Sequence, residues 1–526
     1  MRPGAGTPGP SAARASLNEK EHTMALTDIS KPTDIAMLTD LYELTMAQGL
    51  WEQGKQDEQG CFTAFYRDHP FGSAYAVMCG SAELADLVEN MRFTDEDIAY
   101  LAGLTAPAGG SMFSPAFLEY LRGFTPHVDI DAVPEGELVF PREPLVRVTG
   151  STLECQLLET ALLNAIGFQT LVATKTARVV AAAKGRPVAE FGLRRAQGPD
   201  GGMAVARASY VAGCASTSNV LAGRKYGIPV SGTHAHSWVM SFDSELEAFR
   251  AFAASSPNNC TLLIDTYDVR EGVENAITVA REMEARGERL AGIRIDSGDL
   301  AKLSAYVRDR FDAEGLPYVK IVVSNDLDEY TIQSLLNQGA PVDSFGVGTK
   351  LATCYDQPAL GCVYKLSAHR AGSDAPWTPV VKLSEQPYKR TIPGVQRVRR
   401  YMDADGSPVC DMIYDEAYLA GEGAARGTEL VAVDDPALVT EVSGLAYREL
   451  LQPVVRDGAA VAPREPLGEA RARCAAALGS LDPVYKRFLY PQSYMVGMEL
   501  DLSRVRDELV RERMAASSSA IPWKRI

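Results

Sequence analysis

The segment Gly232-Thr233-His234-Ala235-His236-Ser237 directly follows a short apolar run at residues 228–230. Two further apolar runs lead in a similar way into Arg294-Ile295-Asp296-Ser297-Gly298-Asp299 and Gly346-Val347-Gly348-Thr349. Strands that end repeatedly in polar or glycine-rich loops are typical of a β/α barrel, whose active site is built from those loops. The sequence therefore predicts an enzyme with one active site at the mouth of a barrel.

Apolar runs of strand length recur through the middle of the chain and are separated by helical patterns. They lie at residues 188–191, 228–230, 262–264, 292–295, 321–323 and 344–347. The later runs follow each other at intervals of about thirty residues, the length of one β/α unit. This rhythm predicts an α/β fold with an irregular TIM-like β/α barrel as the catalytic domain, over residues 151–365.

The sequence changes character on either side of the predicted barrel. Residues 24–150 combine helical patterns with short strand-like stretches, which predicts an N-terminal α+β domain. After residue 365 the pattern loosens, and we interpret residues 366–526 as a C-terminal region that packs on the N-terminal domain. Residues 1–23 are rich in Gly, Pro, Ala and Ser without periodicity, so we expect a disordered tail, with Met24 as an alternative start.

Composition narrows the class of protein. The 526 residues carry a formal charge of −16 and give an isoelectric point near 5.0, which argues against a general nucleic-acid binder. No apolar run reaches the length of a membrane span, and no secretion signal is recognisable. The nine cysteines occur without a Cys-x-x-Cys pair, as in cytosolic proteins with reduced thiols. We therefore expect a cytoplasmic protein that binds neither nucleic acid nor membrane.

Two histidines in the opening segment are candidates for chemistry. His236 at a strand end suits a general base, a nucleophile or a phosphate acceptor, although a hydrogen-bonded loop histidine would look the same. His234 would face the opposite side of an extended chain and is the weaker candidate. The His-x-His spacing also occurs in zinc-dependent hydrolases of barrel type. That alternative lacks further ligands, because none of the four remaining histidines follows a later strand of the barrel.

Arg294 and Asp296 are two residues apart at a strand end, so both side chains are expected to point into one pocket. A guanidinium binds carboxylates and phosphates through two hydrogen bonds. The Asp296 carboxylate could hold Mg²⁺, orient a ribose hydroxyl or stabilise developing positive charge, and these alternatives stay open. For Asp299 we favour the simpler role of N-cap for a helix that begins at Leu300.

Two turns after strands add candidate binding residues. Gly346-Val347-Gly348-Thr349 would expose backbone N–H groups to a phosphate, which is a weak signal on its own. Phe191 near Arg194 suits a flat anionic ligand through ring stacking and charge, unless the ring belongs to the core and the arginine is solvated. Asp265 would place a further carboxylate at the same edge.

Taken together, these segments resemble the nicotinate phosphoribosyltransferase family, and the resemblance covers nearly all of the chain after the tail. It rests on Thr39-Asp40-Leu41-Tyr42-Glu43-Leu44-Thr45-Met46, Phe191-Gly192-Leu193-Arg194-Arg195-Ala196-Gln197-Gly198, Thr217-Ser218-Asn219, Gly232-Thr233, Ala235-His236-Ser237, Arg294-Ile295-Asp296-Ser297-Gly298-Asp299-Leu300, Val323-Ser324-Asn325, Gly346-Val347-Gly348-Thr349 and Lys382-Leu383-Ser384-Glu385. Several of these motifs are long enough to be specific.

The resemblance implies a homodimer with shared active sites, in which later chain completes the N-terminal domain. The enzyme would join nicotinate to 5-phosphoribosyl 1-diphosphate and release nicotinate mononucleotide and diphosphate, the entry step of NAD salvage from nicotinic acid. ATP hydrolysis would be coupled to this reaction. Mg²⁺ would offset the charge of the leaving group, while its protein ligands stay unassigned.

The resemblance also assigns roles to residues at matching positions. His236 would be the phosphorylated histidine, and Asp296 a carboxylate that stabilises positive charge on the sugar. The remaining assignments concern the substrates: Tyr42 from the partner subunit, Thr233 and Arg294 for nicotinate, Phe191 for stacking on its ring, and Arg194, Gly348 and Thr349 for phosphates.

Three other functions are weighed against this one. A nicotinamide phosphoribosyltransferase shares the architecture and the catalytic histidine, but segments 191–198 and 232–237 favour the nicotinate branch. A metal-dependent hydrolase would require bound zinc. A non-catalytic binding protein would keep the fold without any turnover that depends on His236, and the intact set of motifs disfavours it.

Overall fold

Six parallel strands form the sheet that carries the middle of the chain. The computed structural model describes residues 35–384, 390–419 and 427–518, so the expected tail at 1–23 lies outside the described residues. The strands are hydrogen-bonded in the order β7-β6-β11-β10-β9-β8. Their bounds are β6 Val188–Glu190, β7 Ser216–Thr217, β8 Thr261–Leu263, β9 Gly292–Ile295, β10 Lys320–Val323 and β11 Ser344–Val347.

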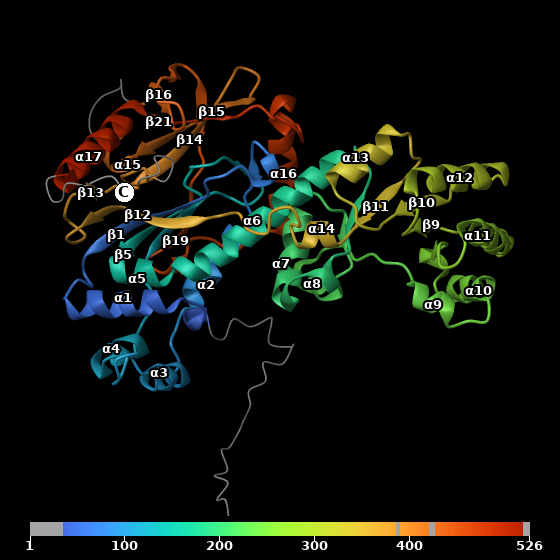
Figure 1. Ribbon diagram of the computed structural model, residues 1–526, viewed down its shortest axis with the longest axis horizontal. Coiled ribbons are helices and arrows are strands. Elements are labelled where there is room, and N and C mark those ends of the chain that lie inside the picture. The colour runs from blue at the N-terminus through green and yellow to red at the C-terminus, as the bar shows by residue number, and fades with distance from the viewer. Residues whose placement is uncertain (1–34, 385–389, 420–426, 519–526) are drawn as a thin grey trace, which may run out of the picture.

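Helices connect these strands, as parallel neighbours require (Figure 1). They are α7 Gly198–Val211, α8 Val220–Tyr226, α9 His236–Met240, α10 Glu245–Ser255, α11 Val269–Ala285, α12 Leu300–Ala313, α13 Glu329–Asn337 and α14 Thr349–Ala352. Asp299 accepts a hydrogen bond from the backbone N–H of Lys302 at 3.2 Å, which confirms its predicted role as the N-cap of α12. The strands themselves are apolar and buried, as in Ile293, Ile295 and Val347.

The parallel strands do not close into a barrel within the described residues. The sheet ends at β7 and β8, and the segment 228–231 between them forms a single bridge, from Val230 to Thr217. Pro229 in this segment has no N–H to donate to a ladder. The prediction of an α/β fold with parallel strands is confirmed, whereas a closed TIM-like barrel is not found and the run at 228–230 is not a strand.

An antiparallel sheet combines strands from distant parts of the chain, in the order β13-β12-β1-β5-β3-β19-β20. Its strands are β1 Gln59–Phe65, β3 Asp129–Ala132, β5 Val146–Ser151, β12 Val363–Arg370, β13 Thr378–Pro379, β19 Gln452–Arg456 and β20 Ala459–Ala460, and a separate pair joins β2 Ala76–Val77 to β4 Leu138–Val139. Four strands of the later chain therefore complete a sheet that the N-terminal part begins.

The helices of this part are α1 Leu41–Glu52, α2 Leu84–Asn90, α3 Asp95–Ala102, α4 Pro115–Arg122, α5 Thr152–Leu157 and α6 Glu159–Ala182. The long helix α6 packs against β12 at one end of the molecule and against α7 and α13 toward the parallel sheet (Figure 1). It thereby connects the two sheets mechanically.

A third, mixed sheet is formed by the last part of the chain, in the order β17-β16-β21-β15-β14-β18. Its elements are β14 Gln396–Met402, β15 Pro408–Asp415, β16 Glu429–Ala432, β17 Val439–Glu441, β18 Ala446–Glu449 and β21 Met495–Glu499, with helices α15 Glu416–Leu419, α16 Leu467–Ser480 and α17 Leu500–Ser518. Within the described ranges, no helix combines the length and the apolarity that crossing a membrane requires.

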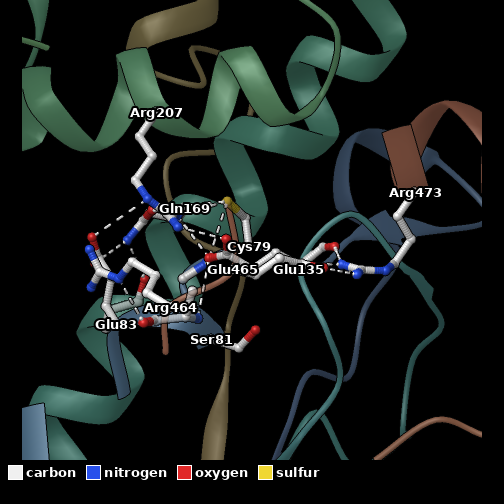
Figure 2. Close-up of polar contacts among 12 residues, drawn as sticks. Cys79, Ser81, Glu83, Glu135, Gln169, Arg207, Arg464, Glu465 and Arg473 are labelled. Atoms are coloured by element: carbon white, nitrogen blue, oxygen red, sulfur yellow. Dashed lines mark hydrogen bonds and ion pairs between the residues drawn. The ribbon is translucent and has the colours of Figure 1, made fainter. Parts of the chain in front are cut away.

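A buried ion pair ties α7 to the N-terminal part of the chain (Figure 2). Arg207 of α7 approaches Glu135, in the loop between β3 and β4, with Nη2 2.6 Å from Oε2. The same guanidinium donates to Gln169 of α6 at 3.0 Å, and Glu135 accepts the backbone N–H of Gly80 at 2.6 Å. Burial alone raises the pKa of Glu135, but the guanidinium and the backbone donors lower it below its ordinary value. The pair therefore stays charged and fixes α7 to the loop between β3 and β4, while the hydrogen bond to Gln169 fixes α7 to α6.

Candidate active site

Arg294 on β9 is the centre of a polar cluster at the carboxyl ends of the parallel strands. Its Nε donates to Ser324 Oγ at 2.7 Å, its Nη1 to Thr233 Oγ1 at 3.1 Å, and its Nη2 lies 3.0 Å from Asp296 Oδ1. Ser324 follows β10, and Thr233 belongs to the segment between β7 and β8. Three separate parts of the sequence therefore meet at one guanidinium, and Arg294 and Asp296 lie together as their spacing predicted.

His236 is the first residue of α9 and stands beside this cluster. Its Nδ1 lies 3.2 Å from Thr266 Oγ1, and its Nε2 lies 3.8 Å from Asp296 Oδ2. About 40% of the side chain is exposed, so a ligand can reach the ring. Because Thr266 contacts one nitrogen and a carboxylate faces the other, the ring is held with its Nε2 toward the Arg294 cluster.

Asp265 supports the cluster from the end of β8. Its Oδ2 accepts the backbone N–H of Asp296 at 2.8 Å and the Ser297 hydroxyl at 2.6 Å. Its Oδ1 is buried and has no hydrogen-bond partner in the part of the chain that the structure describes. A buried carboxylate oxygen without a partner is a suitable ligand for a hard cation such as Mg²⁺.

Phe191 follows β6 and lies beside Arg294, with the guanidinium carbon 5.8 Å from the ring centroid. The ring passes so close to Gly346 on β11 that a Cβ at this glycine would lie 2.7 Å from it. Gly348 has a similar constraint, because a Cβ there would lie 3.2 Å from the Phe191 carbonyl oxygen. The glycines of the Gly-x-Gly turn therefore make room for Phe191.

Glu190 anchors the turn that carries Phe191, and this role was not predicted from the sequence. Its Oε2 accepts the Thr217 hydroxyl at 2.6 Å, and its Oε1 accepts the backbone N–H of Gly192. Burial raises the pKa of Glu190, while these two hydrogen bonds lower it. An acidic residue inside an apolar strand was the available signal for this anchor.

Two other predicted phosphate ligands lie near Phe191. Arg194 is exposed on a short 3-10 helix, Leu193–Arg195, and Thr349 is the first residue of α14. Lys350, next to Thr349, forms an ion pair with Asp328 at 2.6 Å. This lysine is therefore already neutralised, and the glycine-rich turn offers backbone and hydroxyl groups rather than a lysine charge.

Tyr42 is the one predicted site residue that lies far from Arg294 in the same chain. It is on α1, beside the antiparallel sheet, whereas β9 lies toward the other end of the molecule (Figure 1). The side chain is 45% exposed. Partial burial, together with the negative charge of Glu159, raises the pKa of Tyr42 to about 12. A single chain therefore does not bring Tyr42 into the cluster.

His234 has a structural contact of its own. Its Nε2 accepts the backbone N–H of Leu263 on β8 at 3.1 Å, and its ring packs edge-on against Phe252, with centroids 4.8 Å apart. Burial lowers the pKa of His234, and the positive charges of Arg294 and His236 lower it further, so the neutral ring is favoured. Its Nε2 lone pair is thus occupied, and in the described residues no group of three or more His, Cys, Asp and Glu side chains is placed to hold a metal.

Comparison with known proteins gives consistent matches along the chain. Models of the nicotinate phosphoribosyltransferase family match residues 37–167 (N-terminal domain), 187–407 (family) and 395–506 (C-terminal domain). The nicotinate phosphoribosyltransferase of Bacillus subtilis is 43% identical over 376 residues, which span 71% of this chain and 74% of that protein. Nicotinate phosphoribosyltransferase 1 of Arabidopsis thaliana is 35% identical over 92% of this chain and 96% of its own length. The crystal structure of human nicotinic acid phosphoribosyltransferase superposes with a TM-score of 0.77 at 32% identity, covering 90% of this chain and 99% of the human one.

Proposed function

The chain belongs to the nicotinate phosphoribosyltransferase family, and we propose that it joins nicotinate to 5-phosphoribosyl 1-diphosphate with coupled ATP hydrolysis. The products are nicotinate mononucleotide and diphosphate, so the reaction supplies NAD biosynthesis from nicotinic acid. The observation that carries this proposal is the cluster in which Arg294, flanked by Phe191, lies beside His236 and Asp296. Arg294 and Phe191 suit the binding of an aromatic carboxylate. His236 and Asp296 suit phosphoryl transfer and the stabilisation of charge on a sugar.

Nicotinate recognition is assigned to Arg294, Thr233 and Phe191. The guanidinium donates to the substrate carboxylate, as such groups do in two-hydrogen-bond pairs, and the Phe191 ring stacks on the pyridine. Ser324 and Asp296 hold the guanidinium in place at 2.7 and 3.0 Å. A neutral carboxamide offers no negative charge to this guanidinium, which is why nicotinate rather than nicotinamide is the proposed substrate.

The bond-forming step is a substitution at C1 of the ribose. The pyridine nitrogen forms the new bond to C1, and the bond from C1 to the diphosphate oxygen breaks with its electron pair. Positive charge develops on the sugar during this exchange, and the Asp296 carboxylate is placed to stabilise it. Gly348, Thr349 and Arg194 are assigned to the phosphate groups through backbone N–H, hydroxyl and guanidinium donors.

ATP is proposed to phosphorylate His236. With its Nδ1–H directed to Thr266 Oγ1 at 3.2 Å, the ring keeps a lone pair on Nε2. This nitrogen forms a bond to the γ-phosphorus while the bond to the ADP oxygen breaks. Water later cleaves the P–N bond and releases inorganic phosphate, so His236 is regenerated once per cycle.

Mg²⁺ fits the donor set of this site. Asp265 has an unpartnered buried oxygen and Asp296 a second carboxylate nearby, and Mg²⁺ usually takes one or two carboxylates together with water and substrate phosphates. When bound, the cation would neutralise charge on the phosphates of the donor and of ATP. Asp265 and Asp296 are the residues proposed to hold it.

A homodimer with shared active sites is proposed from the position of Tyr42. Tyr42 is surrounded in sequence by exposed apolar side chains, namely Leu38 just before α1 and Leu41 and Met46 on the helix. Large apolar side chains that are exposed in one chain are typical of a surface that becomes buried at an interface. In a two-fold dimer this face of α1 would cover a partner, and Tyr42 would enter the partner's nicotinate pocket. The distance between Tyr42 and Arg294 within one chain is what supports this arrangement.

The test is product formation from nicotinate or nicotinamide with 5-phosphoribosyl 1-diphosphate and Mg²⁺, with and without ATP. We expect nicotinate mononucleotide to form faster with ATP, and His236→Ala to abolish this stimulation. His369→Ala is the matched control, because this exposed histidine lies on β12 away from the cluster. Turnover of nicotinamide alone would move the protein to the nicotinamide branch, and no turnover of either substrate would contradict the proposal.

A further inference from the structure

Four charged side chains meet where the long helix α6 packs against α13 and α14 (Figure 1). Lys175 of α6 is fully buried, and its Nζ lies 2.7 Å from Glu329 Oε2 and 2.6 Å from Asp356 Oδ2. About one turn later on α6, Arg178 donates from Nε to Glu329 Oε1 at 2.8 Å. Two cations and two carboxylates therefore neutralise each other between α6, the start of α13 and the segment that follows α14.

The free energy of folding does not by itself account for this cluster. Taking charges out of water costs about as much free energy as the attraction between them returns. A buried network in which every charge has its partner does fix geometry, because few arrangements satisfy all of its members. Lys175 has a carboxylate on two sides, and its Nζ lies 5.1 Å from the centroid of the Phe71 ring. The position of its ammonium group is therefore closely defined.

The short helix α14 is tied to the start of α13 on both of its sides. On the first side, Lys350 pairs with Asp328, the N-cap of α13, at 2.6 Å. On the other side, Asp356 is joined through Lys175 to Glu329, the first residue of α13. Consecutive residues of α13 thus hold the two ends of one short segment.

Hydrogen bonds within this segment connect Asp356 to the glycine-rich turn. The backbone N–H of Tyr355 donates to the carbonyl oxygen of Lys350 at 3.2 Å. The Thr353 hydroxyl donates to the carbonyl oxygen of Thr349 at 2.8 Å. Thr349 is the first residue of α14 and a proposed phosphate ligand. A displacement of Asp356 is therefore passed on to the group that is assigned to the phosphates.

We propose that Lys175 is a positioning residue for the phosphoribosyl donor, because through Asp356 it holds α14 where Thr349 can meet a phosphate. The inference rests on the proposed function and deepens it, since it adds a buried residue that touches no substrate. Nicotinate recognition should not depend on Lys175. When Lys175 is changed, Arg178 still holds Glu329, so the start of α13 stays in place.

Two variants break the same contact from opposite sides. Lys175→Met keeps a long side chain but removes the ammonium group, while Glu329 keeps its ion pair with Arg178. Asp356→Asn removes a charge from a side chain that is 44% exposed, so it serves if the buried substitution prevents folding. Lys184→Met is the matched control, because this exposed lysine just after α6 contacts only the last residue of α13, at 3.4 Å.

The first measurement is the binding of 5-phosphoribosyl 1-diphosphate with Mg²⁺, by calorimetry without nicotinate. We expect the Kd to rise by about tenfold in Lys175→Met and in Asp356→Asn, because a misplaced Thr349 loses its hydrogen bond to phosphate. In Lys184→Met the Kd should stay within about twofold. The double variant should bind no more weakly than the weaker single variant, since both changes remove one contact. An unchanged Kd in both single variants would overturn the proposal.

Steady-state kinetics and chemical denaturation separate positioning from a general loss of structure. The KM for the phosphoribosyl donor should rise with the Kd, while the KM for nicotinate stays within about twofold of the unaltered value. Equal rises in both KM values, in step with lost stability, would reduce Lys175 to a structural support and overturn the inference.

The same data distinguish this inference from the proposed function. An unaltered protein that binds the donor but forms no nicotinate mononucleotide would contradict the proposed function alone. The comparison of Kd values would then still decide the role of Lys175. An unaltered protein that does not bind the donor would contradict both.

Discussion

The imidazole of His234 takes the place of a backbone carbonyl at the free edge of β8. Replacing it by leucine leaves the Leu263 N–H buried without its acceptor, which should lower the free energy of unfolding by about 1–3 kcal/mol. The same change loosens the segment that carries Thr233 and His236, so kcat should fall together with stability. Amide hydrogen exchange at Leu263, measured beside kcat and KM, reports both effects.

His234→Gln is the informative partner of that variant, because its side-chain oxygen can accept the same N–H. It should restore the protection of Leu263 and most of kcat. The burial-lowered pKa of His234 adds a pH effect: the contribution to stability is present above the ordinary value of 6.5 and is lost as the pH falls through the lowered value. Equal exchange at Leu263 in all three proteins would show that the contact does not hold the segment.

Gly346 controls the position of the Phe191 ring, because a Cβ there would lie 2.7 Å from two ring carbons. Gly346→Ala should push the ring away from Arg294 and raise the KM for nicotinate by roughly tenfold, a change of about 1.4 kcal/mol. The KM for the phosphoribosyl donor should change less. Gly468→Ala, at a position with open space around it, is the matched control for steady-state kinetics. An unchanged KM for nicotinate would remove Phe191 from the proposed pocket.

At the scale of elements, the docking of α1 on α6 depends on Glu43. Its carboxylate is buried and accepts the hydroxyl and the backbone N–H of Thr160 at 2.6 and 3.0 Å. Burial raises the pKa of Glu43 to about 7, against the lowering effect of the Thr160 hydrogen bonds. Because the folded protein binds this proton more tightly than the unfolded one, the stability it contributes is lost as the pH rises from about 4.5 to 7.

Glu43→Gln imitates the protonated side chain and should therefore stabilise the protein above pH 7. Chemical denaturation at pH 5 and at pH 8 measures the difference between variant and unaltered protein. That difference should shift in favour of glutamine at the higher pH. A difference that does not change with pH would contradict the raised pKa of Glu43. Because Tyr42 is the neighbouring residue on α1, the same docking orients the proposed dimer contact.

Elements with strong local patterns could be predicted from the sequence. Strands β9 and β11 have the bounds expected from their apolar runs, and Asp299 caps α12 as expected. The prediction of a strand at 228–230 was wrong. Pro229 has no N–H to donate to a neighbouring strand, and this segment forms only a single bridge. At the edge of β8, the side chain of His234 accepts the Leu263 N–H where a neighbouring strand would otherwise do so. Periodicity reports burial, and it does not report whether a neighbouring strand completes the hydrogen bonds.

At the scale of the whole molecule, sequence patterns could not predict which distant strands and side chains pair with each other. The ladder between β19 and β3 joins residues more than 300 positions apart, and the loop carboxylate Glu135 pairs with Arg207 of α7. In the candidate site, reactive groups after strands were predictable because parallel strands end at one edge. The role of Glu190, which positions Phe191 from within a strand, was not predictable, because it depends on the hydroxyl of Thr217, 27 positions later in the sequence.

The proposed dimer predicts that two inactive proteins can restore one activity. Tyr42→Ala damages only what a subunit gives to its partner, whereas His236→Ala damages only the site on the parallel sheet. Random association of the two variants makes half of the dimers mixed, and each mixed dimer has one intact site of two, so about a quarter of the sites are intact. Co-expressed variants should therefore recover about a quarter of the activity of the unaltered enzyme, measured as nicotinate mononucleotide formed per subunit. If Tyr42 acted within its own chain, neither site of a mixed dimer would carry both unaltered residues, and no activity would be recovered. The separately folded variants, mixed without dissociation, are the control. A mixture with no more activity than the sum of its two variants would place Tyr42 outside the catalytic cycle of the partner.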